Sequence, residues 1–554
     1  MRGIAEQRGQ QTQDMPKSPE IPSLWRPLHT PTFRNLIIAD VVSDIGAFMQ
    51  STGAAWLMVS LNAGPMYVAL TQTASALPFF MFALPAGAIG DIVDRRKLIL
   101  YTETWMVAVA LVLAILTIGG FIAPLSLLIL TFALSAGDAF ETPTWRAVLP
   151  ELVSKEDLPA ASALNGIEFN LARAIGPGLA GLVIAAAGVG SAFLLNAVSF
   201  AGVILVIARW KRATHKRTTP PETVAGATVA AIRYVRYSPA IRTLLTRTGL
   251  VMFFASGLLA LLPSLAHIVK NSPTVYGLLL GCFGLGAVLG ALIMQRVRAR
   301  WSTEAVVAAG VAVFGASTLA ASMLHSLPAL SAVMLVAGAA WIVFLSLFNV
   351  LVLNHAPGWV RARVLAISTL VFQGAIAVGS AAWGAVAARL GIGTTLLYAG
   401  AGTVSMTALA FFLPLPDETV DLTSWNHWRL PPVQSFAMPT ADDLGPVLVT
   451  VEYEVAPQEA ADFLKAARQY RRIRRRDGAQ RWGIFRDMEN AHRYVETFIV
   501  GSWAEHLRQH ERFTRADRET EERVLRYVKS EPKVHHLISV ETTTRSDRRV
   551  VPDQ

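Results

Sequence analysis

The chain has 554 residues, of which 53% are hydrophobic and 16% are charged, and its formal net charge is +10. Soluble domains carry about 25% charged residues, so this composition excludes an ordinary soluble protein and favours lipid as the main solvent. Lys and Arg lie mostly between or beyond apolar blocks, as membrane topology requires, so the positive charge does not indicate nucleic-acid binding. The single cysteine, Cys282, excludes an intramolecular disulfide and a CxxC metal site.

Residues 1–30 are polar, lack the apolar segment of a cleavable signal peptide and are predicted to form a disordered cytoplasmic tail. The apolar blocks that follow are about 20 residues long, which is the length of helix that crosses about 30 Å of hydrocarbon. They predict an all-α membrane domain with 12 transmembrane helices in two six-helix halves, 31–210 and 241–415, joined by a cytoplasmic linker, 211–240. The expected helices are 34–60, 66–90, 98–119, 123–143, 162–187, 191–209, 241–268, 274–297, 303–324, 328–353, 362–388 and 393–413.

The charges of the connecting segments predict the orientation, because short loops rich in Lys and Arg stay in the cytoplasm. The even-numbered connections hold the basic residues, among them Arg95, Arg96 and Lys97. The odd-numbered connections contain almost no Lys or Arg. With an even number of helices, both termini are expected on the cytoplasmic side of the bacterial inner membrane.

After a linker over 416–445 the composition becomes charged and soluble. Residues 446–541 read as a strand, an amphipathic helix, two strands, one longer helix over about 503–530 and a last strand, followed by a tail over 542–554. The order βαββαβ is that of a cytoplasmic α+β domain of the ferredoxin-like type.

The sharpest motif lies between the second and third expected helices. It contains Gly87, Asp91, Asp94, Arg95 and Arg96. Small residues let helices approach closely, Asp91 can cap a neighbouring helix, and the arginines hold the loop at the headgroups. An ordinary positive-inside turn would need only the basic residues, so a gating role is the favoured interpretation.

This motif resembles the signature loop of the major facilitator superfamily, although Ile92 stands where that family often has Arg and Asp94 where it often has Gly. The segment TPTWRAVLPELVSKEDLPAASALNGIEFNLARAIGPGLAGLV at 142–183 looks like the branch of bacterial transmembrane secretion effectors that includes the enterobactin exporter. The resemblance spans residues 24–415. It implies proton-coupled secondary export of small amphipathic molecules, such as drugs or siderophores, by alternating access across the lipid bilayer.

Ionisable residues within membrane helices are rare because each costs about 2.5–3.5 kcal/mol at the helix centre. All those singled out fall in the first half: Asp40, Asp44, Glu103, Asp138, Glu141, Glu168 and Arg173. Asp44, Glu168 and Arg173, with the uncharged Asn170, are the candidates for a coupling or substrate cavity, in which a carboxylate takes and releases a proton. Asp40, Glu141 and Glu168 could instead be solvated or paired near the cytoplasmic ends.

The chain has no Gly-Lys pair and therefore no P-loop, and the common hydrolase and metalloprotease motifs are absent. The prediction is a transporter, not an enzyme, with no cofactor. His506 and His510 share a helix face, but without a third ligand no metal site is predicted. The element order and the aromatic strands of the C-terminal domain resemble the dimeric α/β barrel domains of small monooxygenases, which implies a homodimer through this domain. A membrane-tethered oxidising enzyme or a ligand sensor stays open as the alternative.

Overall fold

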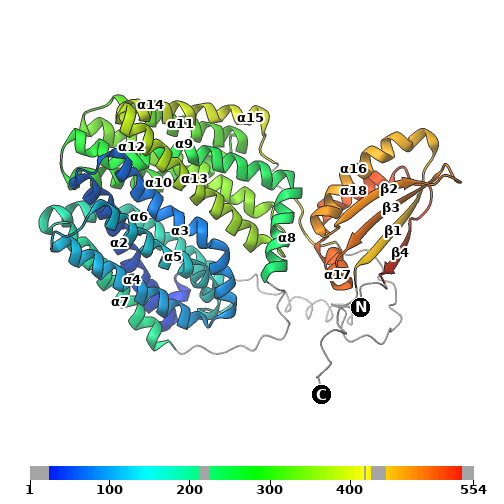
Figure 1. Ribbon diagram of the computed structural model, residues 1–554, viewed down its shortest axis with the longest axis horizontal. Coiled ribbons are helices and arrows are strands. Elements are labelled where there is room, and N and C mark those ends of the chain that lie inside the picture. The colour runs from blue at the N-terminus through cyan, green and yellow to red at the C-terminus, as the bar shows by residue number, and fades with distance from the viewer. Residues whose placement is uncertain (1–23, 211–223, 417–419, 426–444, 540–554) are drawn as a thin grey trace, which may run out of the picture.

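A computed structural model describes residues 24–210, 224–416, 420–425 and 445–539. The helices gather into one large body, and a small domain with a four-stranded sheet stands beside it (Figure 1). The predicted tails, most of residues 1–30 and all of 542–554, fall outside these ranges, as do parts of both predicted linkers.

The first half follows a short 3-10 turn, η1 (Arg26–His29). Its six long helices are α2 (Pro31–Ser60), α3 (Gly64–Ile92), α4 (Arg95–Ile118), α5 (Pro124–Leu152), α6 (Leu158–Ala187) and α7 (Val189–Arg209). The joints between them are short and use glycines at positive φ, such as Gly120 and Gly188, where only a residue without Cβ turns freely.

The second half begins after α8 (Val224–Tyr237), a helix of the linker. Its membrane helices are α9 (Pro239–Val269), α10 (Pro273–Arg298), α11 (Thr303–Met323), α12 (Leu327–Asn354), α13 (Arg361–Leu390) and α14 (Ile392–Ser405), which a 3-10 turn, η2 (Met406–Ala408), extends into α15 (Leu409–Phe412).

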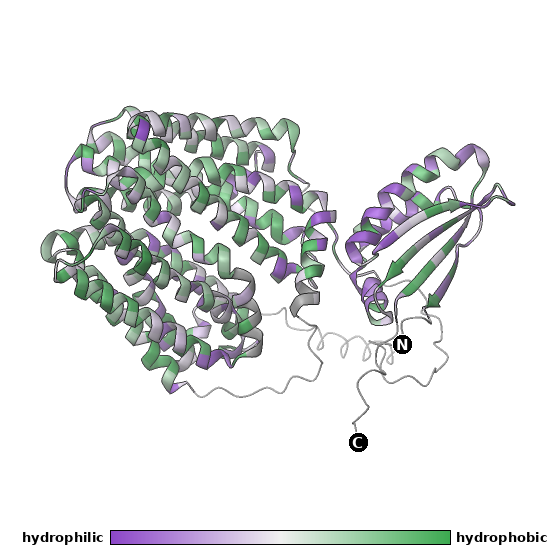
Figure 2. Cartoon of the chain, viewed as in Figure 1, coloured by the Kyte–Doolittle hydropathy of each residue, from purple (hydrophilic) through white to green (hydrophobic). Residues whose placement is uncertain are grey.

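The multi-pass helical membrane fold is confirmed, and Figure 2 shows its helices mostly in the apolar colour while the helices of the small domain are mostly hydrophilic. Within the described ranges, ten helices are long and apolar enough to cross a membrane, and α2 and α3 are not among them. The number of twelve therefore stays a prediction. One predicted helix boundary was wrong, because α5 continues to Leu152 instead of 143. The predicted linker contains α8.

The two halves contact each other mainly through α3 with α13 and through α6 with α10. Small residues allow the approach: a Cβ on Gly181 would meet the backbone of Pro273 and Thr274, and one on Gly384 would meet Ala69. Trp56 stacks on Tyr276, with ring centroids 6.3 Å apart, and joins the halves near the odd-numbered loops, which carry few basic residues. Further close approaches, of Gly284 to Ala174 and of Gly374 to Phe80, continue the contact toward the middle of the helices.

The small domain contains β1 (Val447–Glu454), η3 (Pro457–Glu459), α16 (Ala460–Asp477), β2 (Arg481–Arg486), β3 (Arg493–Val500), α17 (Trp503–Arg512), α18 (Arg515–Leu525) and β4 (Lys533–Ile538). Its sheet has the order β2-β3-β1-β4 with antiparallel neighbours, which confirms the ferredoxin-like arrangement. The single helix expected over 503–530 was wrong. The chain breaks at Phe513, and Thr514 begins α18 with a capping box to Asp517.

Candidate functional site

The structure brings the ionisable residues of the first half together from four helices. Asp40 and Asp44 lie on α2, Glu103 on α4, Asp138 and Glu141 on α5, and Glu168 and Arg173 on α6. Asp40 is close enough to Asp44, Asp138, Glu141 and Glu168 to interact with each of them electrostatically. We name these seven residues the carboxylate cluster. Six acids therefore face one guanidinium in a region where charge is weakly screened.

Two acids of the cluster are deeply buried. Glu168 is 4% exposed, and its carboxyl group lies within hydrogen-bond reach of that of Asp44. Glu103 is 2% exposed and lies beside Glu141, whose Oε2 accepts a hydrogen bond of 2.8 Å from Thr102. Two carboxyl groups that meet away from water are costly as a pair of anions, so each of these pairs can share a proton.

Part of the cluster remains open. Asp138 is exposed on α5, and Asp44 and Arg173 are half-buried. Because a carboxylate exposed to hydrocarbon is strongly unfavourable, we expect this surface of α5 to border a water-accessible space.

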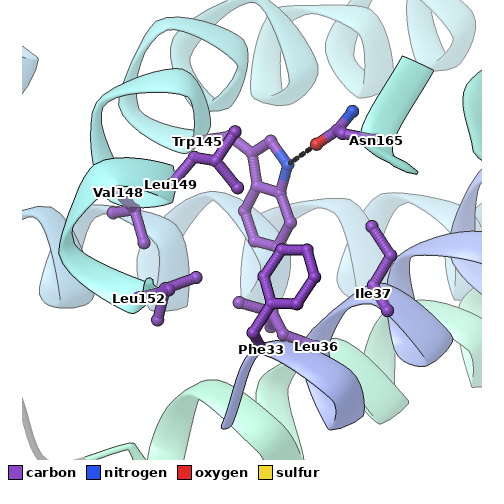
Figure 3. Close-up of a pocket in the computed structure, with 8 residues that line it drawn as sticks. All are labelled: Phe33, Leu36, Ile37, Trp145, Val148, Leu149, Leu152 and Asn165. Carbon is purple, nitrogen blue, oxygen red and sulfur yellow. Dashed lines mark hydrogen bonds between the residues drawn. The ribbon is translucent and has the colours of Figure 1, made fainter. Parts of the chain in front are cut away.

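The uncharged candidate Asn170 does not join the cluster, and neither does Asn165 on the same helix. Asn170 is exposed, and its Nδ2 donates to the carbonyl of Gly166 on its own helix at 2.7 Å. Asn165 accepts a 3.3 Å hydrogen bond from the indole of Trp145 across a small pocket between α2, α5 and α6, whose walls are otherwise apolar (Figure 3). Both amides are thus occupied locally.

The motif between α3 and α4 is described only in part. Gly87 and Asp91 lie in the last two turns of α3, and their side chains fall outside the described part of the chain. Asp94 caps α4, because its side chain accepts a hydrogen bond of 3.1 Å from the backbone N–H of Lys97.

The two arginines of the motif hold the loop against other helices of the same half. Arg95 donates to the carbonyl of Ala147 and to Glu151, at 2.9 and 2.6 Å. Arg96 donates to the carbonyls of Ile207 and Ala208 at the C-terminal end of α7, where a cation is favourable. A gating role of this motif stays a prediction.

One buried ion pair of the second half was missed in the sequence. Arg247 on α9 is 2% exposed, and its Nη1 lies 2.7 Å from Glu304 on α11 and 3.1 Å from the carbonyl of Leu413. The signal was a single arginine near the start of a long apolar helix. Its contacts tie three chain segments together, so a structural role suffices.

A second feature missed in the sequence is the contact between the helical body and the small domain. Arg233 of α8 donates to Glu505 of α17 at 2.9 Å, and Glu505 also accepts from Arg512 at 2.7 Å. The guanidinium of Arg512 lies 4.6 Å above the ring of Trp359, which precedes α13. We name these four residues the docking cluster; Figure 1 shows α8 on the side of the body that faces the small domain.

Further contacts extend the docking cluster. The hydroxyl of Tyr234 in α8 donates to the carbonyl of His355. The guanidinium of Arg476 lies over the Tyr234 ring, 5.5 Å from its centroid. Arg476 is itself held by bidentate ion pairs with Asp477 and Asp517. Of these contacts, the one between Arg476 and Tyr234 joins the small domain to the helical body, and the others hold the two partners in place on their own sides.

The two histidines of the predicted shared face do meet. The Nε2 atoms of His506 and His510 are 3.2 Å apart, Nδ1 of His506 contacts Gln509, and His536 packs against His506 with ring centroids 4.8 Å apart. Among the residues that the structure describes, no group of three possible ligands could hold a metal ion.

Acidification is expected to destabilise the small domain through His506. Burial, together with His510, lowers the pKa of His506 to about 3, whereas an unfolded histidine titrates near 6.5. The unfolded chain therefore binds the extra proton first, and stability falls as the pH drops from about 6.5 toward 3, by at most about 1.4 kcal/mol per pH unit.

Hydrogen exchange of residues 447–538 in the full-length protein, during urea titrations at about pH 7 and about pH 5, measures this loss. His506→Gln should reduce the difference between the two midpoints, and the exposed His492→Gln should leave it as in the wild type. An unchanged difference in His506→Gln would assign the acid sensitivity to other groups.

Two six-helix halves that meet along paired helices, with ionisable side chains gathered inside one half, are the architecture of a secondary membrane transporter. Residues 22–544 match the family described as transmembrane secretion effector, and the chain belongs to this family of the major facilitator superfamily. The match confirms the resemblance noted in the sequence and extends it beyond 24–415 into the small domain.

Curated relatives are bacterial transporters. The multidrug efflux pump Tap of Mycolicibacterium fortuitum is 25% identical over 401 residues, which are 70% of this chain and 97% of that protein. The staphyloferrin A transporter of Staphylococcus aureus is 23% identical over 67% of this chain and 93% of its own length. The enterobactin exporter EntS of Salmonella typhimurium is 27% identical over 47% of this chain and 63% of its length.

Solved structures share the fold. The nucleoside transporter NupG superposes with a TM-score of 0.60 over 69% of this chain and 99% of its own, at 11% identity. A bacterial homologue of the lysosomal transporter Spinster, solved in an inward-facing state, gives 0.53 at 12% identity. The chain is therefore a multi-pass membrane transporter of the major facilitator fold, and family and fold make it a transporter and not an enzyme.

Proposed function

We propose that this protein exports small amphipathic molecules across the bacterial inner membrane, using protons as the coupling ion and alternating access as the mechanism. The observation that carries the proposal is the carboxylate cluster, in which the buried carboxyl group of Glu168 meets that of Asp44. Such a pair can hold one proton between two carboxyl groups and release it when the surroundings become wetter. The efflux pumps and siderophore transporters among the relatives support export of small molecules.

The charge pattern supports an orientation with both termini and the small domain in the cytoplasm. The contacts between the halves include a stack of Trp56 on Tyr276 near the predicted outer side. Export would require the halves to rock about the α3–α13 and α6–α10 contacts.

The experiment is accumulation of drugs and siderophores in inverted membrane vesicles, with and without a proton gradient. Export by proton exchange predicts accumulation that requires the gradient and disappears with a protonophore. Accumulation that persists after the gradient is collapsed would contradict proton coupling.

A homodimer through the small domain belongs to the same proposal. Alternation along the strands sends one set of side chains into the domain core and leaves the other set on the opposite face, including Leu448, Ile499, Phe485 and Leu537. Phe485 and Leu537 are 60% and 54% exposed, and a second copy would cover this face. Cross-linking of the purified transporter should give a dimer that Phe485→Asp reduces; a monomer in both would contradict it.

A further inference from the structure

Arg173 occupies an unusual position within the carboxylate cluster. Its guanidinium lies 5.1 Å from the centroid of the Phe169 ring, on the preceding turn of α6. Phe169 in turn packs against Phe48 of α2, with ring centroids 5.7 Å apart. Asp44, one turn before Phe48, interacts electrostatically with Arg173.

These groups have the composition of a site for an organic cation. Aromatic faces attract cations, and a neighbouring carboxylate adds charge neutralisation in a weakly screened region. The surroundings disfavour an anion, because Asp44 interacts with Asp40, Asp138 and Glu168, and Arg173 is the one guanidinium that the described part of the cluster contains. The carboxyl group of Glu168, which is 4% exposed, lies beside Asp44 and adds a second acidic group to this side of the site.

We propose that Arg173 is a tethered cation that fills the substrate's cationic subsite, formed by Asp44, Phe48 and Phe169, until a lipophilic cation displaces it. This inference rests on the proposed function and names the substrate class as lipophilic cations. Displacement is feasible because the guanidinium stands on a long flexible chain and is half-buried, and because no ion-pair geometry fixes it to Asp44. On release, the side chain returns to the subsite and lowers the affinity for the departing cation.

The test is equilibrium binding of radiolabelled tetraphenylphosphonium to the purified full-length protein in detergent, with no proton gradient. Arg173→Gln removes the competing charge, so we expect tighter binding by about tenfold, which corresponds to about 1.4 kcal/mol. Arg173→Lys keeps the charge and should bind within about threefold of the wild type. Asp44→Asn, in either background, should abolish binding.

The opposite results are equally clear. Equal or weaker binding by Arg173→Gln, in protein that elutes as a folded species, overturns the inference. The inference is also overturned if Arg173→Gln loses binding while Arg173→Lys keeps it, because the positive charge would then help to position the ligand instead of competing with it. Binding is measured without a proton gradient, so the two proposals can fail separately. If Arg173→Gln binds tetraphenylphosphonium more tightly but the wild type shows no gradient-driven flux, the proposed export is overturned and this inference stands. If the wild type shows gradient-driven flux but Arg173→Gln binds no more tightly, this inference alone is overturned.

Discussion

Replacing Asp44 by Asn is expected to reduce gradient-driven accumulation in inverted vesicles by at least about tenfold, or about 1.4 kcal/mol of the transport barrier. The amide has nearly the size of the carboxyl group but cannot take or release a proton. Asp44 interacts with Asp138, Glu168 and Arg173 at once, so its charge influences most of the carboxylate cluster. Glu168→Gln should reduce accumulation in the same direction.

The matched control is Asp157→Asn. Asp157 lies at the start of α6 in the same half, and its partner Arg26 is 55% exposed, so little stability is lost with this ion pair. The control should accumulate substrate as the wild type does. If Asp44→Asn keeps gradient-dependent accumulation at the wild-type rate, proton coupling does not pass through this carboxylate.

Removing the carboxylate of Glu505 is expected to loosen the small domain from the helical body. Glu505 accepts from Arg233 and Arg512, and Arg512 is 4% exposed. Burial raises the pKa of Glu505, but the hydrogen bonds and charges of Arg512 and Arg233 lower this pKa by more, as expected for a carboxylate held as an anion. Glu505→Ala removes the carboxylate that accepts hydrogen bonds from both guanidinium groups, at a cost of about 2–5 kcal/mol.

Hydrogen exchange of residues 228–237 and 355–360 in the full-length protein measures this loss, because both segments lie under the docked domain. Protection should fall in Glu505→Ala and stay unchanged in Glu511→Ala, which alters an exposed residue of the same helix. Equal protection in both variants would show that the aromatic contacts of Trp359 and Tyr234 hold the domain without the ion pairs.

Docking of the domain on α8 and on the segment before α13 has a mechanical consequence. Both elements belong to the second half or lead into it, so a rocking motion between the halves would carry the domain along. We therefore expect the flux of Glu505→Ala to report whether the domain limits that motion.

The sequence by itself determined the elements whose signal is local. Blocks of apolar residues gave the membrane helices, alternation gave the four strands of the small domain, and the positions of rare ionisable residues placed the carboxylate cluster in the first half. These patterns follow from the solvent that each residue meets, and a one-dimensional period records that directly.

Tertiary structure decided what depends on neighbours from elsewhere in the chain. Helix α5 runs through Pro143 and Pro150, because in a membrane bundle neighbouring groups can satisfy the backbone that a proline frees. Whether Asn170 faces the cluster or its own backbone depended on the rotation of α6 against α2 and α10. The docking cluster joins Arg233, Trp359 and Glu505 across hundreds of residues, and no local period encodes such a meeting; only the packing of the domain on the second half does.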